Sequence, residues 1–234
     1  MVVTILKRKY DEIVSNEHFR NYLIAIQNFE SISENEIRDI LTEHYKNARS
    51  RDQAWKNYKG ILYEYAVFRL LQQIIDNDKE LNRKISLSTG EQLASSIKEQ
   101  IVIKNWNEIL PDVDMLIIDK NKNLVKAIIS CKTSLRERLT ETAFWKRELE
   151  KHKRTRDMKI VFITTDKDNE LKINTNRYIL LHVIDYTFIT DPTRYNELEK
   201  HYTETYGAKE DFMTLISKVK PISNIRDFIK SLLP

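Results

Sequence analysis

Apolar residues recur at helical spacing through the first third of the chain. Ser33 and Glu36 form a capping box, and Ile32 and Ile37 flank it as a hydrophobic staple, which is typical of a helix start. A second capping box at residues 50–53 opens a longer helix, in which apolar side chains keep the same spacing. We therefore expect a helical section that packs one face against a core.

The pattern changes to that of β-strands from about residue 84. Short apolar runs with strand-like composition occupy residues 84–88, 100–103, 113–118, 124–131, 159–164 and 178–184. The third and fourth runs are joined as a hairpin across residues 119–123, and a capping box from Ser134 to Glu137 opens a charged helix that reaches about Lys153. This order predicts an α/β fold with a mixed central sheet flanked by helices and a helical N-terminal addition.

No internal repeat and no linker rich in Gly, Ser or Pro interrupts the sequence. We therefore expect a single domain over residues 1–234. Within it, residues 1–50 would form the helical addition, about 55–165 the core that carries the chemistry, and 166–234 the C-terminal part of the same domain.

Composition narrows the classes of function. Apolar residues make up 41% and charged residues 32%, with a formal net charge of +4, which is typical of a globular, mildly basic protein. The single Cys131 excludes a disulfide framework and fits a reducing cytoplasm. The apolar stretch at residues 2–6 is too short for a signal peptide or a membrane span, so we expect a cytoplasmic protein. Only three glycines occur, and the glycine-rich loops that cradle nucleotides are absent.

Charged side chains are expected to gather at one end of the hairpin. Because side chains alternate between the faces of a strand, Asp112 and Asp114 share one face of the first strand, and Ser130 and Lys132 share one face of the second. A hairpin can align these faces and bring two carboxylates and an ammonium together. A half-buried lysine needs such anionic partners, and a divalent cation needs such oxygens.

These segments resemble the PD-(D/E)xK nuclease superfamily, and residues 130–138 look most like its type II restriction endonucleases. The resemblance covers about residues 55–165. It implies hydrolysis of phosphodiester bonds in double-stranded DNA with Mg²⁺ as cofactor, bound by the acid that opens the hairpin. Lys132 would orient or deprotonate the attacking water. Asp112 matches the literal Pro-Asp, and Asp114 stands immediately before the apolar strand, so both are candidate catalytic and metal-binding residues.

Ser130 departs from the motif, which has Asp or Glu at this position. Some restriction enzymes of this superfamily have Ser-x-Lys and take the missing carboxylate from the following helix. The resemblance therefore implies Glu141 as the catalytic and metal-binding acid, with Glu148 on the same helix face as the alternative. It also implies Glu64 as a metal ligand, because the first helix of the family often supplies a glutamate. Glu141 and Glu148 are equally explained as part of a salt-bridged surface, and Glu64 is alternatively explained as the partner of a buried basic group.

The resemblance also implies partners. A homodimer would cut a short palindromic duplex site, since symmetric cleavage needs two symmetric active sites, and a DNA methyltransferase would belong to the same system. Arg136 and Arg138 are the candidate DNA contacts, although a charged run is more often a solvated face. Two alternatives stay open: a repair or defence nuclease of the same superfamily, and a DNA-binding relic without catalysis.

Overall fold

The computed structural model describes residues 2–16, 19, 21–90, 93–104, 106, 108–111, 113–135 and 138–233. The chain divides into two compact units, Met1–Gln73 and Ile74–Pro234. The expectation of a single domain stays a prediction. Among the described residues no helix combines the length and the apolar character that a membrane span requires.

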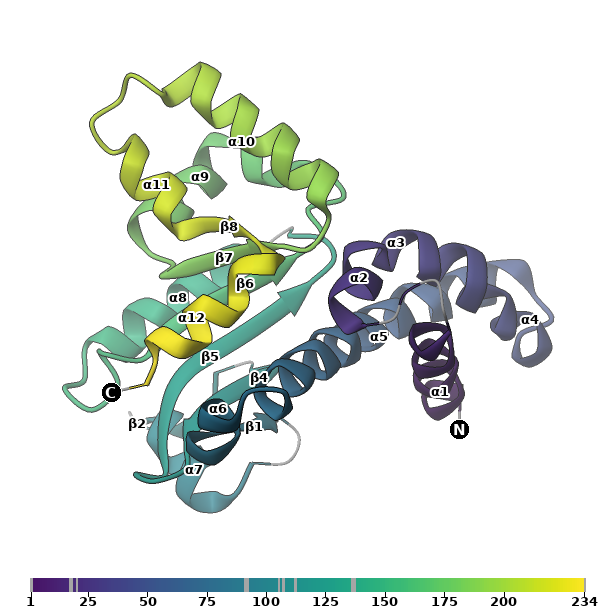
Figure 1. Cartoon of the computed structure of the whole chain (residues 1–234), viewed down its shortest axis with the longest axis horizontal. Helices are drawn as coiled ribbons and strands as arrows, with labels where there is room; N and C mark the ends of the chain where they lie inside the picture. Colours follow the sequence, from purple (N-terminus) through teal and green to yellow (C-terminus); the bar gives the residue numbers. More distant parts are fainter. Residues whose placement is uncertain are drawn as a thin grey trace. The chain divides into compact units, whose positions relative to one another are not determined.

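The first unit is helical (Figure 1). Its helices are α1 (Val2–Ser15), α2 (Tyr22–Gln27), α3 (Phe29–Ile32), α4 (Leu41–His44) and α5 (Ala48–Asp76), with the π-helix η1 (Ser33–Ile37) and the 3-10 turn η2 (Arg38–Ile40) between α3 and α4. Its core contains fully buried aromatic rings, of which Phe29 and Tyr63 meet edge to face with centroids 4.9 Å apart. Such pairs stabilise a core beyond the area that they bury.

The two capping boxes predicted in this unit do not begin its helices. The Ser33 hydroxyl donates to the carbonyl of Glu30, because the helical run has already begun upstream and no helix end is present at Ser33. Helix α5 begins before Ser50, and the side chain of Asn47 accepts the hydrogen bond from the Ser50 N–H. Asparagine caps a helix as well as serine does. The predicted long helix is therefore present, but it begins at Ala48 and not at Ser50.

The second unit is built on a sheet of strand order β1-β4-β5-β6-β7-β8. The strands are β1 (Ile85–Thr89), β4 (Met115–Asp119), β5 (Leu124–Lys132), β6 (Lys159–Thr164), β7 (Tyr186–Ile189) and β8 (Val219–Pro221), and a separate pair is formed by β2 (Ile103–Lys104) and β3 (Glu108–Ile109). Strands β1, β4 and β5 pair antiparallel, whereas β5 to β8 pair parallel. The predicted mixed sheet is confirmed.

The predicted hairpin is present, but β4 begins two residues later than predicted and each strand ends one residue later, at Asp119 and Lys132. The Asp119 carboxylate accepts hydrogen bonds from the N–H groups of Asn121 and Lys122, and Asn123 closes the turn in the left-handed conformation. Asparagine tolerates that conformation better than other non-glycine residues. The register sets Leu116 opposite Ile128 and Met115 opposite Ile129. Extended by one residue, it sets Asp114 opposite Ser130.

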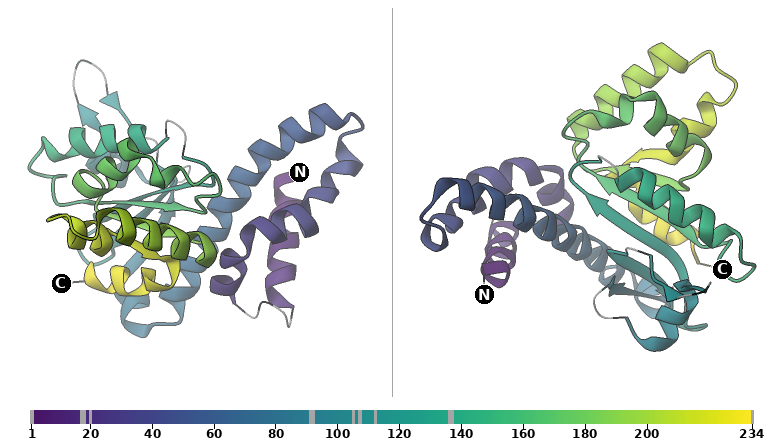
Figure 2. Two further views of the ribbon diagram at one scale, coloured as in Figure 1. Left: turned by 90° about the horizontal axis from the view of Figure 1, so that it is seen from above. Right: turned by 180° about the vertical axis from the view of Figure 1, so that it is seen from behind.

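Helices cover both faces of the sheet (Figures 1 and 2). They are α6 (Lys79–Lys84), α7 (Ser95–Ile101), α8 (Arg138–Glu150), α9 (Asn174–His182), α10 (Pro192–Tyr206), α11 (Phe212–Lys218) and α12 (Ile225–Ser231), with the 3-10 turns η4 (Glu170–Lys172) and η5 (Ile222–Asn224). Helices α7 to α11 share one apolar core with Leu116, Ile128 and Phe162 of the strands. Helix α12 packs on other strand residues through Phe228, whose ring contacts Tyr186 and Phe188.

Two predicted strands are wrong. Residues 100–103 form the end of α7 and the start of β2, and residues 178–184 belong mainly to α9. The strand that follows β6 is β7, further along the chain. A short apolar run such as Ile179 to Leu181 fits a buried strand and a buried helix equally well. In the helix, the rings of Tyr178 and His182 are in contact at i and i+4.

Candidate active site

Asp114 and Lys132 form an ion pair where β4 begins and β5 ends. The Lys132 Nζ lies 3.0 Å from Asp114 Oδ1, and Asp114 Oδ2 accepts a hydrogen bond of 2.6 Å from the main-chain N–H of Cys131. The Asp114 side chain is 8% exposed and that of Lys132 is 19% exposed. Both oxygens of the Asp114 carboxylate therefore have a partner, and the Lys132 ammonium is partly exposed to solvent.

The positions of these two residues follow from strand alternation. Asp114 stands immediately before β4 and keeps the alternation of that strand, so it lies on the face of Leu116. Lys132 ends β5 on the face of Ile128 and Ser130. Ser130 is buried, and its register partner in β6 is Phe162. Asp112, the other candidate acid on the first strand, lies outside the described residues.

The predicted acid of the following helix is not in contact with this pair. Glu141 lies in the first turn of α8, about 39% exposed, and its carboxylate pairs with Arg138 at 3.0 Å. The alternative, Glu148, pairs with Lys151. Among the described residues no three His, Cys, Asp or Glu side chains are grouped so that they could hold a metal ion. The role of Glu141 as a ligand stays a prediction.

The remaining predicted site residues are Glu64, Arg136 and Arg138. Glu64 is a half-buried residue of α5 in the first unit, whereas Asp114, Lys132 and Glu141 belong to the second. Arg136, one of the two candidate DNA contacts, is not among the described residues. Arg138 is half-exposed at the start of α8, and its guanidinium holds Glu141. Its role in DNA binding stays a prediction.

A loop that sequence reasoning missed braces the segment after Lys132. The Thr165 hydroxyl donates to the carbonyl of Thr133 at 3.1 Å, and the Glu170 carboxylate accepts from the main-chain N–H of Leu135 at 2.7 Å. In the predicted capping box, the Ser134 hydroxyl is buried and has no hydrogen-bond partner among the residues that the structure describes, and Glu137 lies outside them. A carboxylate near the first turn of α8 complements the positive end of its dipole.

Asp166 is a second residue that sequence reasoning missed. It follows β6 with a positive φ of 48°, and its N–H donates to the hydroxyl of Thr164, the register partner of Lys132. The side chain is buried. Oδ1 accepts a hydrogen bond from the Leu171 N–H, whereas Oδ2 has no hydrogen-bond partner within the ranges that the structure describes. Burial raises the pKa of this carboxyl to about 6, against the lowering effect of the hydrogen bonds from the Leu171 and Glu170 main chain.

Comparison with known proteins gives the family of the chain. Residues 93–215 match the BsaWI restriction endonuclease type 2 family. The chain is 31% identical over 215 residues to MjaVIP of Methanocaldococcus jannaschii, a protein named as a type II restriction enzyme, and the match covers 79% of this chain and 93% of the relative. The chain belongs to the type II restriction endonuclease family.

Two further matches agree with this membership of the restriction endonuclease family. HpyAORF263P of Helicobacter pylori, also named as a type II restriction enzyme, is 40% identical over 63 residues, which is 27% of this chain and 33% of the relative. The restriction endonuclease PspGI, solved in complex with substrate DNA, has 16% sequence identity and a TM-score of 0.60, covering 91% of this chain and 77% of that chain. The restriction-endonuclease-like fold predicted from the sequence is confirmed.

The geometry of this restriction endonuclease family member suits chemistry on an anionic substrate. The Lys132 ammonium can reach a phosphate oxygen or a water molecule, because its side chain is partly exposed to solvent. Asp114 supplies the hard oxygen that divalent cations of the Mg²⁺ type prefer. A carboxylate and an ammonium in contact are two elements of a site for metal-assisted hydrolysis.

Proposed function

We propose that this chain is a Mg²⁺-dependent type II restriction endonuclease, which hydrolyses phosphodiester bonds of double-stranded DNA at a short palindromic site. The observation that carries the proposal is the contact between Asp114 and Lys132 at the end of the β4–β5 hairpin. Family membership supports the reaction, and DNA as substrate is supported by relatives named as restriction enzymes and by the substrate DNA bound to PspGI.

The donor set fits magnesium. In proteins Mg²⁺ is usually bound through one or two carboxylates together with waters and substrate phosphates, so Asp114 as a single described carboxylate is within the normal range. Asp112 and Glu141 are both proposed as further carboxylate ligands of the ion, and Glu64 is another candidate. When bound, the ion supplies Lewis-acid polarisation of the phosphate and makes water a better nucleophile.

In the proposed reaction the residues of the chain have separate tasks. Asp114 holds the Lys132 ammonium in place, because its own carboxylate is fixed by the hydrogen bond from the Cys131 N–H. Lys132 donates to the phosphate or to the attacking water and so orients the two for in-line attack. The charge that grows on the phosphate oxygens is stabilised by the preorganised ammonium.

Two copies of the chain are proposed to act together. Cleavage of both strands at a symmetric site calls for two active sites related by a twofold axis, which a homodimer provides. A DNA methyltransferase that protects the same sequence is the proposed partner within the restriction system. Arg136 and Arg138 are the proposed contacts to the duplex, and such contacts would make the affinity fall steeply with salt.

Incubation with a mapped plasmid tests the proposal. Wild-type protein with Mg²⁺ should yield discrete fragments, and sequencing of their ends would give the site and the symmetry of the cut. Lys132→Ala should abolish cleavage and retain DNA binding, because positioning on the duplex depends mainly on phosphate contacts. Lys126→Ala, on the same strand, is the matched control and should cut normally.

Three outcomes would contradict the proposal. Undiminished cleavage by Lys132→Ala would rule out the proposed active site. Undiminished cleavage in excess EDTA would rule out a requirement for a divalent metal ion. Products that depend on DNA structure rather than sequence would favour a repair or defence nuclease. Tight DNA binding without any product, with Mg²⁺ and with Mn²⁺, would favour a DNA-binding protein that has lost catalysis.

A further inference from the structure

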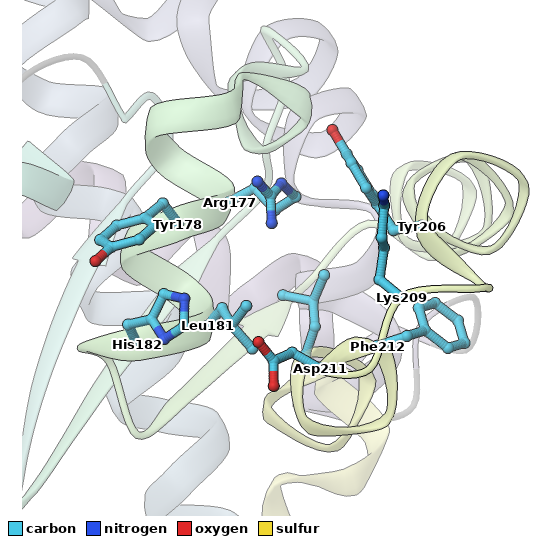
Figure 3. Close-up of a pocket in the computed structure, with 9 residues that line it drawn as sticks. Arg177, Tyr178, Leu181, His182, Tyr206, Lys209, Asp211 and Phe212 are labelled. Carbon is cyan, nitrogen blue, oxygen red and sulfur yellow. The ribbon is translucent and has the colours of Figure 1, made fainter.

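A cavity of about 250 Å³ lies among helices α9, α10 and α11 (Figure 3). Helix α9 supplies Arg177 and Leu181, the end of α10 supplies Tyr206, and the loop before α11 supplies Lys209 and Asp211. None of its lining residues belongs to the pair of Asp114 and Lys132 or to the loop that braces it. Its volume is close to the lower end of the range for small-ligand sites, roughly 300 Å³.

Arg177 in this cavity is stacked on an aromatic ring, and one of its buried donors has no acceptor in the described part of the chain. Its guanidinium lies over the ring of Tyr206 at 4.5 Å from the centroid, and the Tyr206 hydroxyl donates to Asn174 Oδ1 at 2.8 Å, which holds the ring. The Arg177 Nε is buried and has no hydrogen-bond partner among the described residues. Buried donors are nearly always satisfied, so an orphaned one calls for an explanation. A stacked guanidinium leaves its edge free for bidentate binding of an oxyanion.

The rest of the cavity defines the ligand. Lys209 brings a second cation, and in the part of the chain that the structure describes neither it nor Arg177 makes an ion pair. Asp211 is the acidic member of the lining, and in Figure 3 its carboxylate points toward the side of Leu181 and His182. Leu181 and Leu215, both buried, add an apolar wall. Two cations beside an apolar wall match a ligand that combines an oxyanion with an apolar body.

We propose that this cavity binds a small organic oxyanion, a phosphate monoester or a carboxylate on an apolar or aromatic body, with Arg177 and Lys209 on the oxyanion. The backbone of a DNA duplex fits less well, because a cavity of this volume between helices admits a small molecule and not a double helix. The site is separate from the proposed nuclease function, and its test depends on binding alone.

Thermal unfolding of the full chain tests the site with three probes: inorganic phosphate, adenosine 5′-monophosphate and benzoate, each against NaCl at the same ionic strength. A ligand that binds only the folded state raises the Tm in proportion to the logarithm of its concentration. One of the organic probes should raise the Tm more than inorganic phosphate does, because it also covers the apolar wall. Which of the two does so distinguishes a phosphate monoester from a carboxylate.

Variants assign the effect to the cavity. Arg177→Gln combined with Lys209→Gln should weaken binding at least about tenfold, since each lost charged hydrogen bond is felt on that scale. Lys209→Gln alone removes an exposed side chain without touching the Tyr206 stack, and it should also weaken binding, which covers the case in which Arg177→Gln unfolds the chain. Asp211→Asn is the matched control and should bind equally well or better, because it removes a negative charge.

The proposal is overturned if no probe raises the Tm above the NaCl control, or if the double variant responds like the wild type. A duplex oligonucleotide serves as the last arm. If the double variant loses affinity for the duplex and the small probes have no effect on the wild type, the two cations belong to a DNA-contacting surface and not to a ligand site.

Discussion

The carboxylate of Glu170 accepts a hydrogen bond from the main-chain N–H of Leu135 at 2.7 Å. Leu135 is fully buried and lies between Lys132, which ends β5, and the start of α8. The bond therefore ties the loop after β6 to the segment that leaves the candidate active site, next to the bond from Thr165 to Thr133. Catalytic groups must be held to within a fraction of an ångström, so this brace is expected to matter for Lys132.

Glu170→Ala should lower the rate of DNA cleavage about tenfold or more, because it releases the Leu135 amide and loosens the segment that carries Lys132. Glu170→Gln retains an acceptor oxygen and should recover most of the rate. Single-turnover cleavage measures the effect, and duplex affinity, measured in parallel with Ca²⁺, should change little.

Glu204→Ala is the control for Glu170, since Glu204 is an exposed residue of α10 whose partner Lys200 lies 3.8 Å away. Equal rates for Glu170→Ala, Glu204→Ala and the wild type would show that the Leu135 bond has no part in positioning. A loss in Glu170→Ala that Glu170→Gln does not recover would point to the charge of Glu170 and not to its acceptor.

Glu141→Gln tests the proposed migrated acid. If Glu141 is recruited to the metal, the substitution should lower the cleavage rate at least about a hundredfold, the scale of losing a preorganised electrostatic partner. Glu148→Gln should do much less. Stability should hardly change, because the pair with Arg138 is half-exposed and such pairs contribute about 0 to 1 kcal/mol. A wild-type rate in Glu141→Gln would transfer the role to Glu148 or Glu64.

Asp166 predicts a pH dependence of stability. Its pKa is raised to about 6 in the folded chain by burial, above the value of roughly 3.9 for an unfolded aspartate. Between these two values the folded state holds a proton that the unfolded state has released, so stability falls as the pH rises through this window. Asp166→Asn imitates the protonated carboxyl and should stabilise the chain by roughly 2 kcal/mol at pH 8, and by much less at pH 4.

Urea unfolding at the two pH values measures this difference, and Asp168→Asn is the control from the same loop. Asp168 is exposed, so its substitution should leave the pH profile of stability like that of the wild type. If Asp166→Asn is no more stable than the wild type at pH 8, the orphaned Oδ2 is not a cost to the folded state.

Lys146 predicts a large effect on stability far from the active site. Its side chain is 6% exposed, and its Nζ lies 2.7 Å from the Asp185 carboxylate. Lys146→Met would leave Asp185 without its nearest cation, and loss of one partner of a buried pair costs about 3 kcal/mol. Lys200→Met, in the exposed pair with Glu204, should change the free energy of unfolding by less than about 0.5 kcal/mol. Similar changes in the free energy of unfolding for Lys146→Met and Lys200→Met would disprove the prediction.

Helices and strands could be predicted from the sequence where a periodic apolar pattern was bounded by residues that favour turns. The apolar strands on either side of Asp119 to Asn123 could be placed because their runs are bounded by polar turn residues on both sides. The apolar run at residues 178–184 could not be placed, because its length fits a strand and a helix, and only packing of Leu180 in the core beside the sheet decides for the helix.

The sequence by itself determined that Asp114 and Lys132 share a face, because alternation along a strand and pairing across a hairpin are local rules that leave little choice. Only the tertiary structure decided which residues lie beside the segment that follows Lys132. Thr165, Asp166 and Glu170 follow β6 in the chain. They lie at the same end of the sheet as Lys132, because β5 and β6 pair parallel with Lys132 in register with Thr164. Parallel pairing brings together residues far apart in the chain, and no periodicity of a single sequence records which of them will meet.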